Sequence, residues 1–197
     1  MTMGWKYGKP IKEKLMTLEE PGKTLPFDAD RGLVDEVIAQ CDIRALVESV
    51  KGKNENAAIE ALEAFGEKLM KLTIELADSK FIDRTGEMVE RVAEQTGVSF
   101  PHRFERYVEL AILASRPTDR WNITKATTRE LVLQVSSCTL SKAMAEAGLA
   151  LPCKAMCLAS FEVAAARTGD KLNMEMSKTV TKDGICEFTF SLRPQEK

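Results

Sequence analysis

The sequence predicts an α+β fold, in which an N-terminal helical layer packs on a C-terminal antiparallel sheet that also carries a cysteine-bearing helix. Two observations lead to this prediction. Apolar residues recur at helical spacing from Asp30 onward, whereas residues 129–138 and 182–192 alternate apolar and polar side chains as strands do. A chain of 197 residues can bury one full core, so we expect a single domain over residues 1–197.

This domain divides into three parts: an irregular N-terminal arm over 1–30, a helical part over 31–116, and a sheet and cysteine-rich part over 117–197. The arm mixes Lys, Gly and Pro without sustained periodicity. Two apolar helix faces follow, one made of Val34, Val37, Ile38 and Cys41, the other of Ile59, Leu62, Phe65, Gly66, Leu69, Leu72, Thr73 and Leu76. Cys41 therefore reads as a core residue.

Two more helices are expected before the sheet, one around residues 88–93 and one beginning after Ser99-Phe100-Pro101. The second places His102, Glu105 and Glu109 on one side, which has the composition of a partial metal site. Because arginines flank the same side, we interpret it as a solvated, salt-bridged helix surface.

The last part of the chain alternates strands with helices. Residues 129–138 predict a strand that ends at Cys138, and a short helix then stops at Gly148. A longer helix begins at Pro152 and ends at Gly169. Residues 171–180 and 186–192 predict two paired strands, joined by a two-residue turn at Asp183-Gly184.

Four of the five cysteines lie in the last sixty residues. Alternation turns Cys186 toward the apolar face of its strand, with Phe188, Phe190 and Leu192. Cys153 and Cys157 are four residues apart on one helix face, beside Ser160, and Cys153 sits in the first turn, where the helix dipole stabilises a thiolate. Packing of this helix on the sheet would bring Cys138, Cys157 and Cys186 to one pocket.

Three uses of these sulfurs stay open at this point. They fill an apolar interface, or one of them is a nucleophile, or Cys138, Cys153, Cys157 and Cys186 together hold zinc or an iron–sulfur cluster. A Cys-x-x-Cys knuckle, the usual sequence sign of such a metal site, does not occur here.

The order Cys138, Gly148, Cys157 and then DGICEFTF (183–190), in about the last third of this chain, resembles the C-terminal half of the L-2-amino-thiazoline-4-carboxylic acid hydrolase-like proteins. Their pattern has a strand ending in Cys, a helix ending in Gly, a Cys-x-x-Asp on the next helix, and a closing Gly-x-Cys-x-Phe strand. Cys138, Cys157 and Cys186 match its cysteines, and Gly184 and Phe188 match their neighbours. The last strand is also similar to that of vinyl-reductase-type small-molecule-binding domains. Where the pattern has Asp, this chain has Ser160, which cannot act as a carboxylate base.

The resemblance implies a hydrolase-like protein that acts on a C–N bond of a small heterocyclic or amide-like substrate and needs no cofactor. Cys157 would be the nucleophile, Cys186 and Cys138 would line the catalytic pocket, and Ser160, Phe188 and Cys153 would contact the substrate. The alternative is a non-enzymatic sensor that binds a small molecule or a metal in the same pocket. A third alternative is an interaction module with an apolar interface.

Composition excludes some partners. Acidic and basic residues number 30 and 28, so no basic surplus supports nucleic-acid binding. No apolar run approaches the roughly 20 residues of a membrane span, and the N-terminus lacks the apolar core of a signal peptide, so we expect a cytoplasmic protein without disulfides. We further expect a small-molecule ligand and a homodimer.

Overall fold

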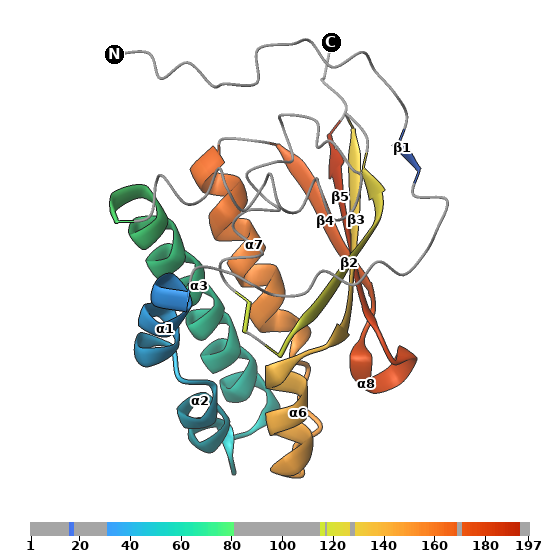
Figure 1. Cartoon of the computed structure of the whole chain (residues 1–197). Helices are drawn as coiled ribbons and strands as arrows, with labels where there is room; N and C mark the ends of the chain where they lie inside the picture. The colour runs from blue at the N-terminus through green and yellow to red at the C-terminus, as the bar shows by residue number, and fades with distance from the viewer. Residues whose placement is uncertain are drawn as a thin grey trace.

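The fold is α+β, with helices in the N-terminal half packed on an antiparallel sheet in the C-terminal half (Figure 1). The computed structural model describes residues 16–17, 31–80, 115–116, 118–126, 129–168 and 171–193. The helices expected around 88–93 and after Ser99, with His102, Glu105 and Glu109, lie outside these residues, as does most of the expected N-terminal arm.

Among the described residues, three helices build the N-terminal layer: α1 (Arg31–Gln40), α2 (Ile43–Val50) and α3 (Glu55–Ser79). The predicted apolar faces are confirmed, because Val37, Cys41, Leu62, Leu69 and other residues of both faces are buried. Asp42, which the sequence analysis did not single out, separates α1 from α2 by accepting a hydrogen bond from the backbone N–H of Arg44.

The sheet has five strands in the order β1-β2-β3-β5-β4, all paired antiparallel. The strands are β1 (Met16–Thr17), β2 (Arg120–Ala126), β3 (Glu130–Ser137), β4 (Leu172–Lys178) and β5 (Cys186–Leu192). β3, β4 and β5 confirm the predicted strands. β2 was not predicted, and β1 shows that residues 16–17 of the expected irregular arm pair with the sheet.

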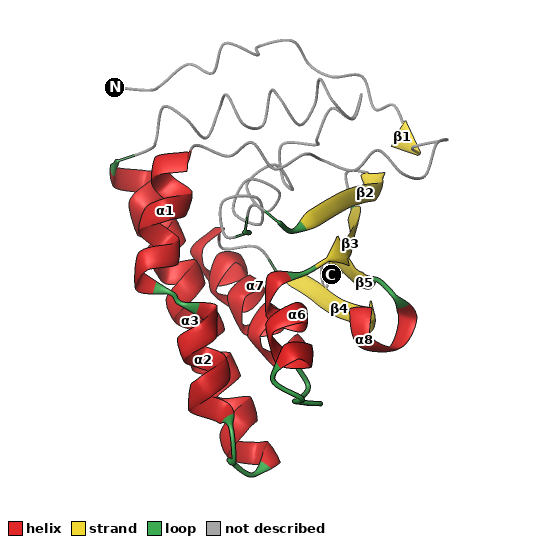
Figure 2. Ribbon diagram, turned by 60° about the horizontal axis from the view of Figure 1, so that its bottom comes forward, coloured by secondary structure: helices red, strands yellow, loops and turns green. Residues whose placement is uncertain are grey.

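Helices α6 (Thr139–Glu146) and α7 (Lys154–Thr168) confirm the two predicted helices of the C-terminal part. Gly148, at a φ of +68°, ends the first of them as expected. α7 lies between α3 and the sheet, and α1, α2, α3, α6 and α7 gather on one side of the strands (Figures 1 and 2).

The connection between β4 and β5 corrects the predicted two-residue turn. Strand pairing ends at Lys178 and Glu187, and between them the chain forms the one-turn helix α8 (Val180–Asp183). Gly184 follows with a φ of +73°, while Asp183 is helical. The Asp-Gly pair therefore ends a helical turn within a connection of seven residues, 179–185, instead of forming a two-residue turn.

A close backbone approach fixes how α3 and α7 pack. A Cβ added to Gly66 on α3 would lie 2.1 Å from the carbonyl oxygen of Met156 on α7, which is closer than any real Cβ contact. The hydroxyl of Ser160 lies 2.9 Å from both Gly66 O and Met156 O, to which it donates. Glycine at position 66 therefore lets the two helices meet, and Ser160 joins them.

Gly66→Ala is expected to destabilise the protein by about 3 kcal/mol, since neither backbone can move without breaking this packing. Helix propensity alone would make the same change stabilising by about 1 kcal/mol, because alanine favours a helix more than glycine does. The sign of the measured change therefore shows whether the close approach of the two helices or helix propensity dominates. Urea unfolding measures it. The control is Ala64→Gly, an exposed change on the same helix that reports the propensity difference without the clash. A Gly66→Ala protein as stable as the unmodified chain would contradict the close approach.

Candidate functional site

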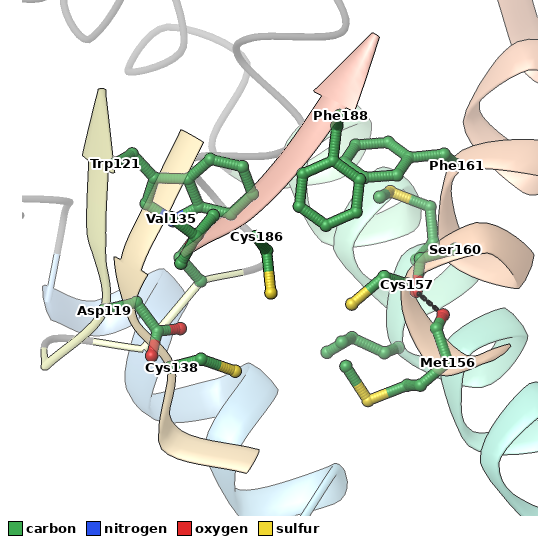
Figure 3. A pocket seen from close by; sticks show the side chains of 13 residues that line it. Asp119, Trp121, Val135, Cys138, Met156, Cys157, Ser160, Phe161, Cys186 and Phe188 are labelled. Atoms are coloured by element: carbon green, nitrogen blue, oxygen red, sulfur yellow. Dashed lines mark hydrogen bonds between the residues drawn. The ribbon is translucent and has the colours of Figure 1, made fainter. Parts of the chain in front are cut away.

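A cavity of about 80 Å³ lies between the inner face of the sheet, α7 and α3. Most of its lining is apolar, and Figure 3 shows how side chains from the sheet face those from α7 across it. The lining residues are Leu69, Met70, Ser115, Asp119, Trp121, Val135, Cys138, Met156, Cys157, Ser160, Phe161, Cys186 and Phe188.

Three cysteines come to this cavity from three different elements. Cys138 occupies the N-cap position of α6, Cys157 lies on α7, and Cys186 begins β5 opposite Val135. Their sulfur atoms point into the same space (Figure 3). The predicted convergence of Cys138, Cys157 and Cys186 is therefore confirmed, and Cys41, buried at the end of α1, lies away from the cavity as expected.

Cys153 differs from its predicted place. It is not among the lining residues, and it packs instead against a second apolar cluster formed by residues of α2, α3, α6 and α7. Its backbone N–H donates to Leu151 O at 2.8 Å. Cys153 precedes Cys157 by one helical turn, and this displacement along the axis brings it beside α6 rather than the sheet.

The thiols of the cavity are held in their protonated form. Burial raises the pKa of Cys138 from 9.0 to about 11, with the carboxylate of Asp119 as a further cause. Burial also raises the pKa of Cys157 well above its ordinary value, and it raises those of Cys186 and Cys153. At Cys153, where the helix start was expected to favour a thiolate, burial works in the opposite direction by disfavouring the charged form.

Cys186 also has a hydrogen-bond partner. Its sulfur accepts the backbone N–H of Val180, at 3.3 Å, where α8 begins. This bond lowers the pKa of Cys186, but burial has the larger and opposite effect. The thiol thus fastens the α8 turn to the end of β5.

Ser160 lines the cavity but its hydroxyl is already used. It donates to the backbone at the contact of α3 with α7, and its side chain is 6% exposed. The Ser160 hydroxyl was predicted to contact a substrate. The structure gives no support for that contact, because the hydroxyl joins α3 to α7 instead. Phe188, the other predicted contact of this kind, does line the cavity.

Aromatic rings close one side of the cavity. Phe188 stacks with Trp121 at a centroid distance of 6.2 Å, and it meets Phe161 edge to face at 5.3 Å. Trp121 belongs to the unpredicted strand β2. Alternation of Trp121 and Ile123 with polar neighbours was a usable sign of that strand.

Asp119 is a cavity residue that the sequence analysis missed. Its carboxylate accepts the backbone N–H of Arg116 at 2.8 Å on one oxygen. The other oxygen accepts the backbone N–H and the hydroxyl of Thr139, at 2.7 and 2.8 Å. Asp119 thereby caps the N-terminus of α6 next to Cys138, although it lies outside that helix. Because this cap comes from a residue 20 positions earlier in the chain, no local spacing in the sequence indicates it.

Glu187 lies on the other face of β5 from Cys186, as predicted. Its carboxylate accepts hydrogen bonds from Gln134, Lys178 and Ser177, and the bond from Gln134 is the main cause of its lowered pKa. This carboxylate is turned away from the cavity thiols, and it cannot take a proton from them.

Neither a metal cluster nor a membrane-spanning helix is found among the described residues. In that part of the chain, no group of three or more His, Cys, Asp and Glu side chains is arranged to hold a metal ion. The zinc and iron–sulfur alternatives for Cys138, Cys153, Cys157 and Cys186 therefore gain no support. Within the same residues, no helix has the length and apolar character needed to cross a membrane.

Comparison with known proteins gives little more. No family model matches the chain, and no curated protein matches it, so the resemblance to the thiazoline carboxylate hydrolase-like family stays a prediction. A solved structure described as "Probing the function of heme distortion in the H-NOX family" is similar over 84% of this chain and 87% of that chain, at 13% identity and a TM-score of 0.40. A likeness at this level supports no argument about fold or function.

The raised pKa of Cys138 predicts a loss of stability in alkali. Between pH 9 and 11 the unfolded chain releases this proton while the folded chain keeps it, so the free energy of unfolding falls as pH rises through that window. The expected loss from Cys138 is about 1.4 kcal/mol per pH unit, and below pH 9 its contribution is constant.

Urea unfolding of the chain and of Cys138→Ala at pH 8, 9, 10 and 11 tests this prediction. The variant should show a shallower decline, whatever its stability at pH 8, because the other titrating groups are common to both proteins. Parallel declines would contradict the raised pKa.

Proposed function

We propose that this protein binds a small, mostly apolar molecule in the cavity between the sheet and α7. The observation that carries the proposal is an apolar cavity of about 80 Å³ lined by three protonated thiols and three aromatic rings. Protonated thiols and aromatic rings are polarisable and apolar, which favours dispersion contacts with such a molecule. An engineered apolar cavity of about 150 Å³ in another protein stays dry and binds benzene or xenon, so a cavity of this kind suits a smaller guest.

The protonation state of the cavity thiols favours non-enzymatic binding over hydrolysis. A cysteine nucleophile works as a thiolate, and burial disfavours that form at Cys157 and at Cys138. The one carboxylate among the described lining residues, Asp119, already accepts three hydrogen bonds from Arg116 and Thr139. These bonds stabilise its ionised form and occupy three of its roughly four acceptor positions, which makes it a weak base.

Hydrolysis of a small C–N bond stays a second candidate, because three thiols and a carboxylate meet at one cavity. In that reaction the Cys157 sulfur would attack the electron-poor carbon of the substrate and displace its nitrogen, which would take up the thiol proton, and water would then cleave the new C–S bond and restore the thiol. Cys138 and Cys186 would line the same space.

Xenon is a suitable first probe of the binding proposal, since it is apolar, small and chemically inert. Methyl resonances of Leu69, Met70 and Val135 are expected to shift as xenon pressure rises. Cys157→Leu should abolish those shifts by filling the space. Ala166→Leu places the same side chain at an exposed position of α7 and should keep them. Unshifted methyl resonances in the unmodified chain would overturn the binding proposal.

Thiol labelling separates binding from hydrolysis. In the binding reading, iodoacetamide should label Cys157 in the native protein at pH 8 far more slowly than in the unfolded chain, since burial raises the pKa of this thiol and shields it from the reagent. A catalytic thiolate would label as fast in the folded protein as in the unfolded chain, or faster.

The free energy of unfolding of Cys157→Ser separates the same two readings by a second measurement. Cys41→Ser, at a buried cysteine away from the cavity, is its control. In the binding reading both changes are expected to cost about 1–3 kcal/mol, because each buries a hydroxyl in a site built for sulfur. A Cys157→Ser protein with undiminished stability and fast Cys157 labelling in the unmodified chain would favour the hydrolase.

A further inference from the structure

The thiol of Cys186 connects the cavity to a turn on the surface of the protein. Its sulfur points into the cavity (Figure 3), and it also accepts the backbone N–H of Val180 at 3.3 Å. Val180 is the first residue of α8. One sulfur atom therefore borders both the cavity and the start of α8.

The α8 turn is held together by its own hydrogen bonds. The backbone N–H of Asp183 donates to Thr179 O at 2.8 Å, and the Asp183 carboxylate accepts the N–H of Thr179 at 2.9 Å. Residues 181–184 are exposed, whereas the Val180 side chain packs against the core cluster that holds Cys186. Val180 is thus where α8 meets the cavity wall, through its side chain and through its N–H.

The residue after Cys186 holds the chain on the opposite face of β5. Glu187 accepts hydrogen bonds from Ser177 at 2.9 Å and from Lys178 at 3.1 Å, at the end of β4. These bonds fix the end of β4 and do not include α8. The end of β4 can therefore stay in place while α8 leaves Cys186, so α8 can move as a unit about its junction with β4.

The bond from Val180 also decides where the Cys186 sulfur lies. A cysteine side chain turns about one bond, Cα–Cβ, and has three staggered positions. The Val180 N–H selects the position seen here, which leaves the cavity its free volume of about 80 Å³. A thiol released from this bond gains dispersion contacts by turning into the free space, because sulfur is polarisable. The turned thiol would occupy part of the volume that a guest needs.

We propose that α8 is a guest-responsive element: a molecule in the cavity favours the state in which the Val180 N–H is bonded to Cys186, and an empty cavity allows α8 to detach. This inference rests on the proposed function, and it adds a means by which occupancy of the cavity changes the protein surface. By linkage, docking of α8 strengthens guest binding by the same factor by which the guest strengthens docking.

Exchange of the Val180 amide proton with water measures the docked state directly. In the unmodified chain, xenon at saturating pressure is expected to slow this exchange about threefold, as one weak neutral hydrogen bond allows. Helium at the same pressure controls for the effect of pressure alone. Cys157→Leu, which fills the cavity, should show no xenon effect on the same proton.

Val180→Pro tests the reciprocal effect. Proline lacks the N–H that bonds to Cys186, and it suits the first position of a helix. The preceding residue, Thr179, already has the extended backbone that proline requires there, with a φ of −129° and a ψ of 144°. Val180→Ala also loses side-chain atoms but keeps the N–H. Val180→Pro is therefore expected to bind xenon about threefold more weakly than Val180→Ala, as measured by the shifts of the Val135 methyl resonances.

The outcomes are distinguishable. If xenon shifts the cavity methyl resonances but leaves the exchange of the Val180 amide unchanged, the inference is overturned and the binding function stands. Equal xenon affinities of Val180→Pro and Val180→Ala would overturn the inference in the same way. If xenon shifts none of those resonances in the unmodified chain, the binding function is overturned, and the inference with it. The exchange measurement needs no variant, so it decides the inference even if Val180→Pro does not fold.

Discussion

The contact between Gly66 and the carbonyl of Met156 is the constraint on which the rest of the site depends. It sets how closely α7 approaches α3, and the Ser160 hydroxyl holds the two backbones together there. Met156 is followed directly by Cys157, so the same contact fixes where that thiol stands above the sheet. A bulkier residue at position 66 would push α7 toward the strands and close the cavity, since packed interiors do not absorb an extra carbon without displacement.

The opposite wall is held by a chain of polar contacts that runs through Asp119. Arg116 Nη2 donates to Cys41 O, at 2.6 Å, at the end of α1, and the Arg116 backbone N–H donates to Asp119. Asp119 in turn caps α6 at Thr139, beside Cys138. Arg116 and Asp119 are 5% and 9% exposed, so these bonds are shielded from water and each would be costly to break. The helical layer and the Cys138 wall are therefore positioned by one network.

Burial has two consequences that favour binding over thiol chemistry. The mostly apolar lining of sulfur and aromatic rings favours an apolar guest, and burial raises the pKa of Cys138, Cys157 and Cys186, which suppresses the nucleophilic form. Burial also raises the pKa of Cys153. The apolar environment that supports the binding proposal thus makes the cavity thiols poor nucleophiles.

The sequence by itself determined the α+β class, strands β3, β4 and β5, and the faces of Cys157 and Cys186, because helical and strand periodicities are local and dictate which side chains are buried together. Three features were decided only by tertiary structure. Ser160 became a helix-to-helix link since Gly66, 94 residues away, offered its carbonyl. Asp119 became a cap because Thr139 folded next to it, and burial raised the pKa of Cys153 at the start of α7. Each depends on atoms that are distant in the chain, and no spacing in the sequence records such a distance.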